Sequence, residues 1–144
     1  MSMSPRNGYD EWSALVITFD TRKQIVLVYD MGKPSPVMWK IPGGKKEGNE
    51  SPQETAIREL LEETGIKVGV DDLHLVEEVD KSSHRHPHTL FVFMAKVENF
   101  NGLLRLGDEG EYVALFEMSN IPEMEDFFPP HRRYIEKIYA RDFV

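Results

Sequence analysis

Apolar residues are concentrated in two short runs near the start of the chain, Trp12–Phe19 and residues 24–29. Both runs are rich in β-branched and aromatic residues, and the polar residues 20–23 separate them, so the pattern predicts a β-hairpin. Residues 31–36 contain one glycine and two prolines, which favour a loop. Residues 37–41 then read as a short extended piece.

The next segment carries the start and stop signals of an α-helix. Ser51 is a strong N-cap residue, Pro52 stands at the first helical position, and Glu54 completes a capping box. Gly65 can adopt the left-handed conformation that ends many helices. The sequence therefore predicts a helix over Pro52–Thr64.

At about 100° per residue, this predicted helix has two unlike sides. The apolar side, which is expected to face a core, consists of Ala56, Ile57, Leu60 and Leu61. The opposite side gathers Glu59, Glu62 and Glu63. Like charges at this spacing repel one another, so helix stability alone does not select them. A hard cation such as Mg²⁺ takes oxygen ligands and would turn the repulsion into coordination.

Three later runs predict strands, namely residues 72–80, residues 88–99 and Glu111–Glu117. A proline pair then interrupts the chain before a predicted helix over about residues 131–142. The apolar residues on one side of this helix are Tyr134, Ile135, Ile138 and Tyr139. The order of strands, helix, strands and helix suggests an α/β fold in which a mixed sheet carries a helix on each face.

The composition is that of one globular unit. Of the 144 residues 40% are hydrophobic, and there is no internal repeat, so we expect a single domain over residues 1–144. No apolar run approaches the ~20 residues of a membrane span, and the polar first residues do not resemble a secretory signal. The absence of cysteine excludes disulfides and a cysteine nucleophile. We therefore expect a cytoplasmic protein without membrane association.

The formal net charge of −8 at pH 7 restricts the classes of partner. It argues against a protein that grips long nucleic acid, since such proteins usually carry a basic face. A small phosphorylated substrate chelated to a metal ion is easier to accommodate, because the cation neutralises carboxylates and phosphates together.

Residues 44–66 complete a longer pattern around the predicted helix. Its fixed positions are Gly44, Glu50, Arg58, Glu59, Leu60, Glu62, Glu63, Gly65 and Ile66. This spacing resembles the Nudix box, the signature of the Nudix hydrolases, and every specified position matches. The preceding fragment WKIPGGK is also similar to the usual lead-in of that family.

The resemblance implies a Nudix-like α/β/α sandwich with a central mixed β-sheet, and it admits a homodimer. It also implies Mg²⁺-dependent hydrolysis, with Mn²⁺ as a substitute, of a phosphoanhydride bond by water attack at phosphorus. The substrate would be a nucleoside diphosphate linked to another moiety, as in a nucleotide, a nucleotide sugar or a dinucleoside polyphosphate. The alternative is a non-catalytic module that senses a nucleotide in the same pocket. The intact acidic cluster favours catalysis, because a sensor needs no general base.

The resemblance also implies roles for the box residues. Glu62 and Glu63 are interpreted as metal ligands, and Glu59 as either a ligand or the general base. Arg58 completes the catalytic set as a residue that orients a neighbouring carboxylate. Glu50 is expected either to brace the loop before the helix or to bind the metal.

Outside the helix, further site residues are predicted. Gly43 and Gly44 let the backbone pass close to a phosphate or a metal, and a carbonyl of one of them, Gly44 in our assignment, would complete the metal shell. A late acidic ligand is expected from Glu109, with Glu111 as the other candidate.

Three residues are candidates for substrate binding. Lys45 and Arg85 are expected to meet phosphate oxygens, and Trp39 to stack on a base or sugar. The three histidines around Arg85 raise a zinc hypothesis, but Pro87 interrupts them and no cysteine completes a ligand set, so a polar loop is favoured.

Overall fold

The computed structural model describes residues 3–30, 38–100 and 111–140. In chain order its elements are β1 (Trp12–Phe19), β2 (Gln24–Asp30), β3 (Trp39–Lys40), β4 (Gly43–Lys45), α1 (Pro52–Thr64), η1 (Val70–Asp72), β5 (Leu73–Lys81), β6 (His88–Lys96), β7 (Glu111–Glu117), η2 (Met118–Glu123) and α2 (Pro129–Ala140), where η denotes a short 3₁₀-helix. In these described stretches, no helix combines the length and the apolar character that crossing a membrane requires.

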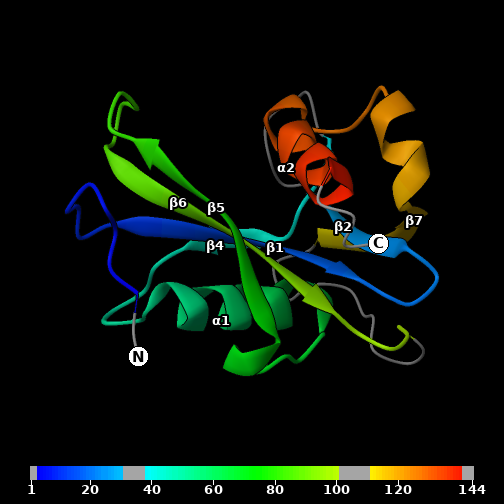
Figure 1. Cartoon of the computed structure of the whole chain (residues 1–144), viewed down its shortest axis with the longest axis horizontal. Helices are drawn as coiled ribbons and strands as arrows, with labels where there is room; N and C mark the ends of the chain where they lie inside the picture. The colour runs from blue at the N-terminus through cyan, green and yellow to red at the C-terminus, as the bar shows by residue number, and fades with distance from the viewer. Residues whose placement is uncertain (1–2, 31–37, 101–110, 141–144) are drawn as a thin grey trace.

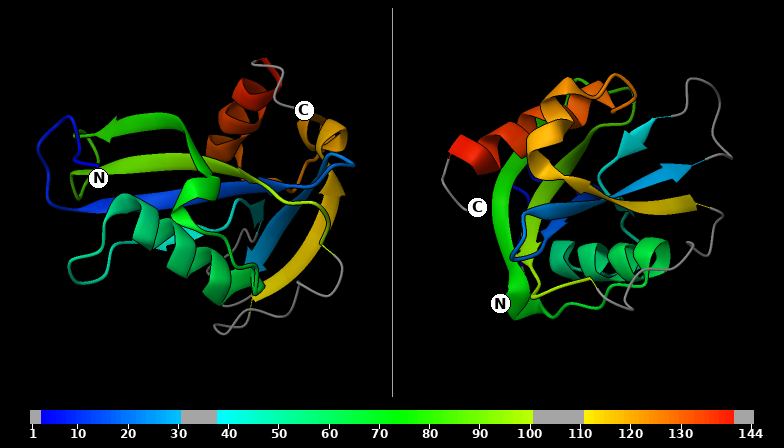
Figure 2. Two further views of the ribbon diagram at one scale, coloured as in Figure 1. Left: turned by 60° about the horizontal axis from the view of Figure 1, so that its bottom comes forward. Right: turned by 90° about the vertical axis from the view of Figure 1, so that its right-hand side faces the viewer.

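The strands form one mixed sheet built around β1 (Figure 2). β1 runs parallel to β6 along its whole length, whereas the other pairings among the described strands are antiparallel. The edge of β1 opposite to β6 pairs with two strands. β4 pairs with residues 13–15, and β2 pairs at Phe19. β2 continues the sheet to β3 and β7. The glycine-containing strand β4 is therefore held by the first half of β1.

Alternate residues of β1 point to opposite faces of the sheet, and one helix covers each face (Figure 1). Ala14 and Val16 belong to the core under α1. Leu15 and Ile17 belong to the core under α2. The predicted sandwich, a mixed sheet between two helices, is confirmed.

The predicted bounds of α1 are confirmed because both of its ends are set by local contacts. The Ser51 hydroxyl accepts a hydrogen bond from the Glu54 amide at 3.1 Å, and the Glu54 carboxylate accepts one from the Ser51 amide at 2.9 Å. Gly65 has a φ of 81°, and its amide donates to the Leu61 carbonyl at 2.9 Å. Removing such an N-cap side chain typically costs about 1 kcal/mol.

The buried side of α1 differs from the predicted apolar side. Ala56 and Leu60 are fully buried as expected, but Leu61 is 39% exposed and Glu63 is only 6% exposed. The reason is that α1 packs against β4 as well as β1, and its contact with β4 includes Glu63. The helix thus buries part of its acidic side in place of the outermost apolar residue.

Other elements also differ from the prediction. α2 begins at Pro129 rather than at His131, because proline fits the first turn of a helix. β6 ends at Lys96 rather than at Asn99, because its pairing with β5 ends at Ala95 and its pairing with β1 ends at Lys96. The glycine loop forms strand β4, since its backbone pairs with β1.

Candidate active site

The packing of β4 against α1 brings two glycines against two glutamates. The Gly43 amide donates a hydrogen bond to Glu63 Oε2 at 2.8 Å. A Cβ at Gly44 would lie 2.4 Å from the carboxyl carbon of Glu59, and a Cβ at Gly43 would lie 2.1 Å from the carbonyl oxygen of Ala14. Both distances are shorter than non-bonded atoms tolerate. The close approach of β4 to α1 and β1 therefore requires glycine at both positions.

The three glutamates of α1 differ in their exposure. Glu63 is buried, the side chain of Glu59 is 14% exposed and that of Glu62 is 37% exposed. Because water screens buried charges less than exposed ones, the carboxylates of Glu59 and Glu63 would attract a nearby cation more strongly than that of Glu62 would. The site thus has an acidic interior beside β4 and opens to solvent at Glu62.

Arg58 donates hydrogen bonds to four residues around this interior, and its Nε also lies 3.4 Å from Glu47 Oε2. Its Nη1 donates to Glu59 Oε1 at 2.9 Å and to Glu62 Oε2 at 3.2 Å. Its Nε and Nη2 donate to the two oxygens of Glu50, at 2.6 and 3.0 Å. Nη2 also donates to the Lys45 carbonyl of β4 at 2.8 Å. The expected pairing with a neighbouring carboxylate is present, and the planar guanidinium holds three carboxylates and β4 in one arrangement.

Glu50 braces the loop that precedes α1. In addition to the bonds from Arg58, its Oε1 accepts from the Glu47 amide at 2.9 Å and from the Thr55 hydroxyl at 3.2 Å. The hydrogen bond with Arg58 is the main cause that lowers the pKa of Glu50 and raises the pKa of Arg58 from their ordinary values. Of the two roles that the sequence left open for Glu50, these contacts favour the brace.

The donor atoms of the site fit a hard divalent cation in their chemistry. Carboxylates of Glu59, Glu62 and Glu63 and the carbonyls of β4 are oxygen ligands of the kind that Mg²⁺ and Mn²⁺ take. Within residues 3–30, 38–100 and 111–140, no three His, Asp or Glu side chains are arranged as a complete set of metal ligands. Arg58 instead holds oxygens of Glu59 and Glu62.

Two further residues, Lys45 and Glu109, were predicted for this site. Lys45 lies in β4 beside the glycines and is exposed, while its carbonyl is bound by Arg58. This contact fixes the backbone of Lys45 and leaves its side chain on the surface. Glu109, the predicted late ligand, lies outside the described residues, as does the side chain of Glu111.

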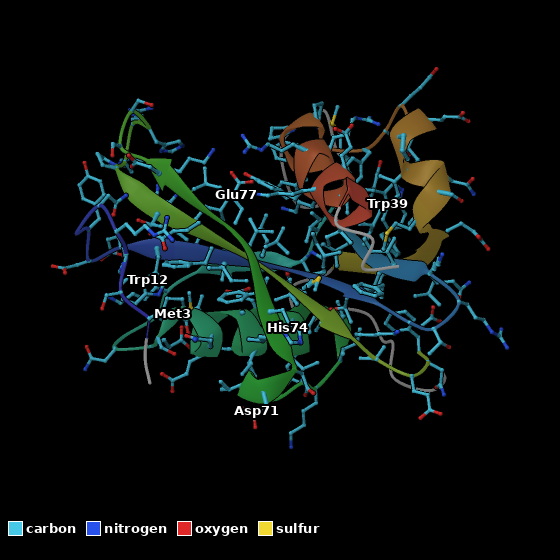
Figure 3. All side chains as sticks on the ribbon, viewed as in Figure 1. Met3, Trp12, Trp39, Asp71, His74 and Glu77 are labelled. Atoms are coloured by element: carbon cyan, nitrogen blue, oxygen red, sulfur yellow. The ribbon has the colours of Figure 1, made fainter. Side chains whose placement is uncertain are left out.

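Trp39 lies on the face of the sheet that is opposite to α1. Its ring centroid is 5.0 Å from that of Tyr29 and 4.9 Å from that of Phe116, and it packs against the core under α2. Figure 3 shows Trp39 beside α2. The structure therefore does not bring the Trp39 ring together with Glu59 and Glu63.

Arg85 is exposed in the turn between β5 and β6. In the sheet, β1 lies between β6 and β4, and the residues of β6 level with the glycines are Phe91 and Val92, which come after this turn. Among the described contacts, none joins Arg85 to the glycines or to the glutamates of α1, and its phosphate contact stays a prediction. In the same turn the rings of His84 and His88 are 5.0 Å apart, but the described histidines are not part of a metal-ligand set.

Three separate elements hold the backbone just before β4. The Ile41 amide donates to Nδ1 of His131 at 3.1 Å, the Pro42 carbonyl accepts from the Val16 amide at 2.9 Å, and α1 binds the next residue through Glu63. Sequence reasoning missed His131. Its only local signal is a histidine in the first turn of an otherwise amphipathic helix, and its partner lies 90 residues earlier in the chain.

Comparison with known proteins identifies the family of this chain. The sequence pattern of the NUDIX domain family matches residues 11–138. A protein of Bacillus subtilis (strain 168), provisionally named 8-oxo-dGTP diphosphatase, is 44% identical over 57 residues, which is 40% of this chain and 36% of that protein. Diphosphoinositol polyphosphate phosphohydrolase 2 of Mus musculus is 24% identical over 133 residues, which is 92% of this chain and 73% of that protein.

The fold is also similar to solved structures. The crystal structure of the MutT protein from Methanosarcina mazei Go1 has a TM-score of 0.73 at 20% sequence identity, covering 92% of this chain and 95% of that chain. The Bacillus similarity is local, because it spans 36% of that protein, whereas the family pattern extends from β1 to α2. The chain therefore belongs to the NUDIX family of pyrophosphohydrolases.

Proposed function

We propose that this chain is a divalent-metal-dependent pyrophosphohydrolase that cleaves a phosphoanhydride bond in a nucleoside diphosphate linked to another moiety. The observation that carries the proposal is the contact of Gly43 and Gly44 with Glu63 and Glu59. It places a backbone without side chains directly beside carboxylate oxygens. The space in which a Cβ of Gly44 would lie is taken by the Glu59 carboxylate, so glycine allows this carboxylate to reach the backbone of β4.

The reaction needs a water molecule in line with phosphorus, a base to take its proton, and positive charge near the phosphate oxygens. Mg²⁺, when bound, supplies that positive charge. We assign Glu59, Glu62 and Glu63, with the Gly44 carbonyl, to hold it. One of these glutamates takes the proton of the attacking water, and Glu59 is assigned as either a ligand or this base.

Arg58 acts in this proposal through its neighbours and is a positioning residue. It holds one oxygen each of Glu59 and Glu62, while Glu50 holds its other nitrogens. The exposed side chain of Lys45, on the same strand as the glycines, is assigned to phosphate oxygens. These contacts reduce the number of side-chain conformations that must be selected when the substrate binds.

The names of the relatives guide the choice of substrates to test. One relative is named for 8-oxo-dGTP and the other for diphosphoinositol polyphosphate. A nucleoside triphosphate and a diphosphoinositol both contain a phosphoanhydride bond, although only the first is a nucleotide. We propose a nucleoside diphosphate derivative as the substrate, and we treat the inositol compound as the competing outcome.

The test is a screen of purified protein with Mg²⁺ against nucleoside triphosphates including 8-oxo-dGTP, nucleotide sugars, ADP-ribose, dinucleoside polyphosphates and a diphosphoinositol polyphosphate. Products are identified by mass. Glu63→Gln is run alongside, because glutamine keeps an oxygen that can accept from the Gly43 amide but removes the charge. Glu136→Gln, an exposed glutamate of α2, is the matched control.

We expect the wild type and Glu136→Gln to cleave one class of compound and Glu63→Gln to be slower by orders of magnitude. Wild-type turnover by Glu63→Gln would overturn the site assignment. Tight nucleotide binding by the wild type without any cleavage would indicate that the chain is a nucleotide sensor and not a hydrolase.

A further inference from the structure

The backbone of residues 39–44 connects the face under α2 with the active site. At its start, the Phe128 amide donates to the Trp39 carbonyl at 2.8 Å, next to the first turn of α2. At its end, Pro42 accepts from Val16 of β1, and β4 begins. The segment is thus anchored by α2 on one side and by the sheet on the other.

The Ile41 amide is the last backbone donor before β4, because Pro42 has no N–H. Ile41 is 1% exposed, so this amide needs a partner inside the protein. Nδ1 of His131 accepts its hydrogen at 3.1 Å, and His131 itself is 8% exposed. Accepting this bond requires an unprotonated Nδ1, which in a neutral ring places the proton on Nε2.

The surroundings of His131 maintain the neutral ring. Burial is the main cause that lowers the pKa of His131 to about 3, and the positive charges of Lys40 and Lys81 act in the same direction. The ring of Phe128 lies edge-on to the imidazole at 4.8 Å, and that of Tyr134 lies at 6.2 Å. The acceptor is therefore present throughout the neutral pH range.

We propose that His131 is a positioning residue of the active site, which holds the Ile41 amide from α2 and thereby sets where β4 meets α1. The Gly43 amide, two residues later, then reaches Glu63 at 2.8 Å. This inference rests on the proposed function of that site. His131 contacts none of the assigned ligands among the described contacts, so it acts through the backbone of residues 41–43.

Two substitutions separate the hydrogen bond from the packing. His131→Leu removes the acceptor and fills the buried position with an apolar side chain. His131→Asn places an amide oxygen where Nδ1 was, one bond beyond Cγ. His131→Gln places its oxygen one carbon farther away and should resemble His131→Leu, which provides a second test should the leucine variant not fold. Ile138→Val, a fully buried position of the same helix, controls for mild loss of packing.

With a substrate from the screen, we expect His131→Leu and His131→Gln to lower kcat about tenfold with little change in KM, because a small misplacement of catalytic groups lowers the chemical rate. His131→Asn should restore most of kcat, and Ile138→Val should equal the wild type. A purely structural role would make the asparagine and leucine variants equally impaired. That result, or wild-type kcat in both the leucine and glutamine variants, would overturn the inference.

A second measurement does not depend on turnover. Hydrogen exchange of the Gly43 amide, followed by NMR without substrate, should be about tenfold faster in the leucine and glutamine variants and near wild type with asparagine. Unchanged Gly43 exchange in all three variants would overturn the inference even in an active enzyme. If the wild type hydrolyses nothing, the proposed function fails, while the exchange rates still decide whether His131 positions β4.

Discussion

Both carboxylate oxygens of Glu50 accept hydrogen bonds from the guanidinium of Arg58, from Nε at 2.6 Å and from Nη2 at 3.0 Å. This pair joins the loop before α1 to the second turn of the helix. It leaves Nη1 of Arg58 directed at Glu59 and Glu62. The arrangement of Glu59 and Glu62 therefore depends on Glu50, whose two carboxylate oxygens both accept hydrogen bonds within the protein.

The first prediction concerns the planar fork of Arg58. Arg58→Lys keeps the positive charge but cannot reach Glu50, Glu59 and Lys45 at once, since an ammonium lacks the fork geometry. We expect kcat to fall by about 10- to 100-fold. The control is Arg133→Lys, at an exposed arginine of α2 that pairs with Glu77 on the other face of the sheet. Equal rates for the two variants in steady-state kinetics would contradict the role given to Arg58.

The second prediction separates the two glycines of β4. An alanine Cβ at Gly44 meets the end of the flexible Glu59 side chain, whereas one at Gly43 meets the backbone of Ala14 and Leu15. Gly44→Ala should therefore displace Glu59 and lower kcat at least about 100-fold, while changing the free energy of unfolding by no more than about 1 kcal/mol. Gly43→Ala should lower the free energy of unfolding by about 3 kcal/mol.

Urea unfolding and kinetics on both glycine variants make this measurement. Gly69→Ala is the matched control, because a Cβ there would lie 3.6 Å from the nearest atom, the Asp72 carboxylate. If Gly44→Ala retained full activity, Glu59 would not need its observed position. If Gly43→Ala were as stable as the control, β4 would not be held as tightly to β1 as the structure indicates.

The glycine pair shows how far sequence reasoning reaches. Local signals determine α1, because Ser51 and Gly65 act within one turn of the helix ends. The resemblance to the Nudix box, rather than a local signal, indicated that Gly44 and Glu59 belong to one site. That Gly43 and Gly44 form a strand was not predictable, because their pairing with β1 depends on tertiary structure.

Other site features depend on the same long-range packing. Leu61 is exposed and Glu63 is buried because α1 packs against β4. The periodicity of the helix alone does not predict this packing. The face to which Trp39 points follows from its pairing with Tyr29. The contact of His131 with Ile41 joins residues 90 positions apart, and no local pattern encodes it.

The third prediction concerns Mg²⁺ and stability. The carboxylates of α1 repel one another, and a bound cation removes that repulsion only in the folded state. Mg²⁺ at 100 times its Kd should therefore raise the free energy of unfolding by about 2.7 kcal/mol and increase Tm. Glu63→Gln should reduce the Tm increase and Glu136→Gln should not, as measured by calorimetry with and without millimolar Mg²⁺. No increase in the wild type would argue against a cation site between α1 and β4.

The fourth prediction follows from the buried imidazole of His131. Its pKa is lowered from 6.5 to about 3, mainly by burial and further by the charges of Lys40 and Lys81. Between these two values the unfolded chain binds a proton that the folded chain does not, so stability is full above pH 6.5 and falls as the pH decreases. For this shift, the change from pH 7 to pH 5 lowers the free energy of unfolding by on the order of 2 kcal/mol.

The measurement is the difference between the wild type and His131→Asn in urea unfolding at pH 7, 6 and 5. Asparagine does not titrate, while the carboxylates and Tyr134 are common to both proteins, so their contributions largely cancel in the difference. The advantage of the wild type over the variant should shrink steadily towards pH 5. A difference that stays constant over this range would mean that the imidazole titrates alike in both states, and His131 would then be neither buried nor held neutral by the Ile41 amide.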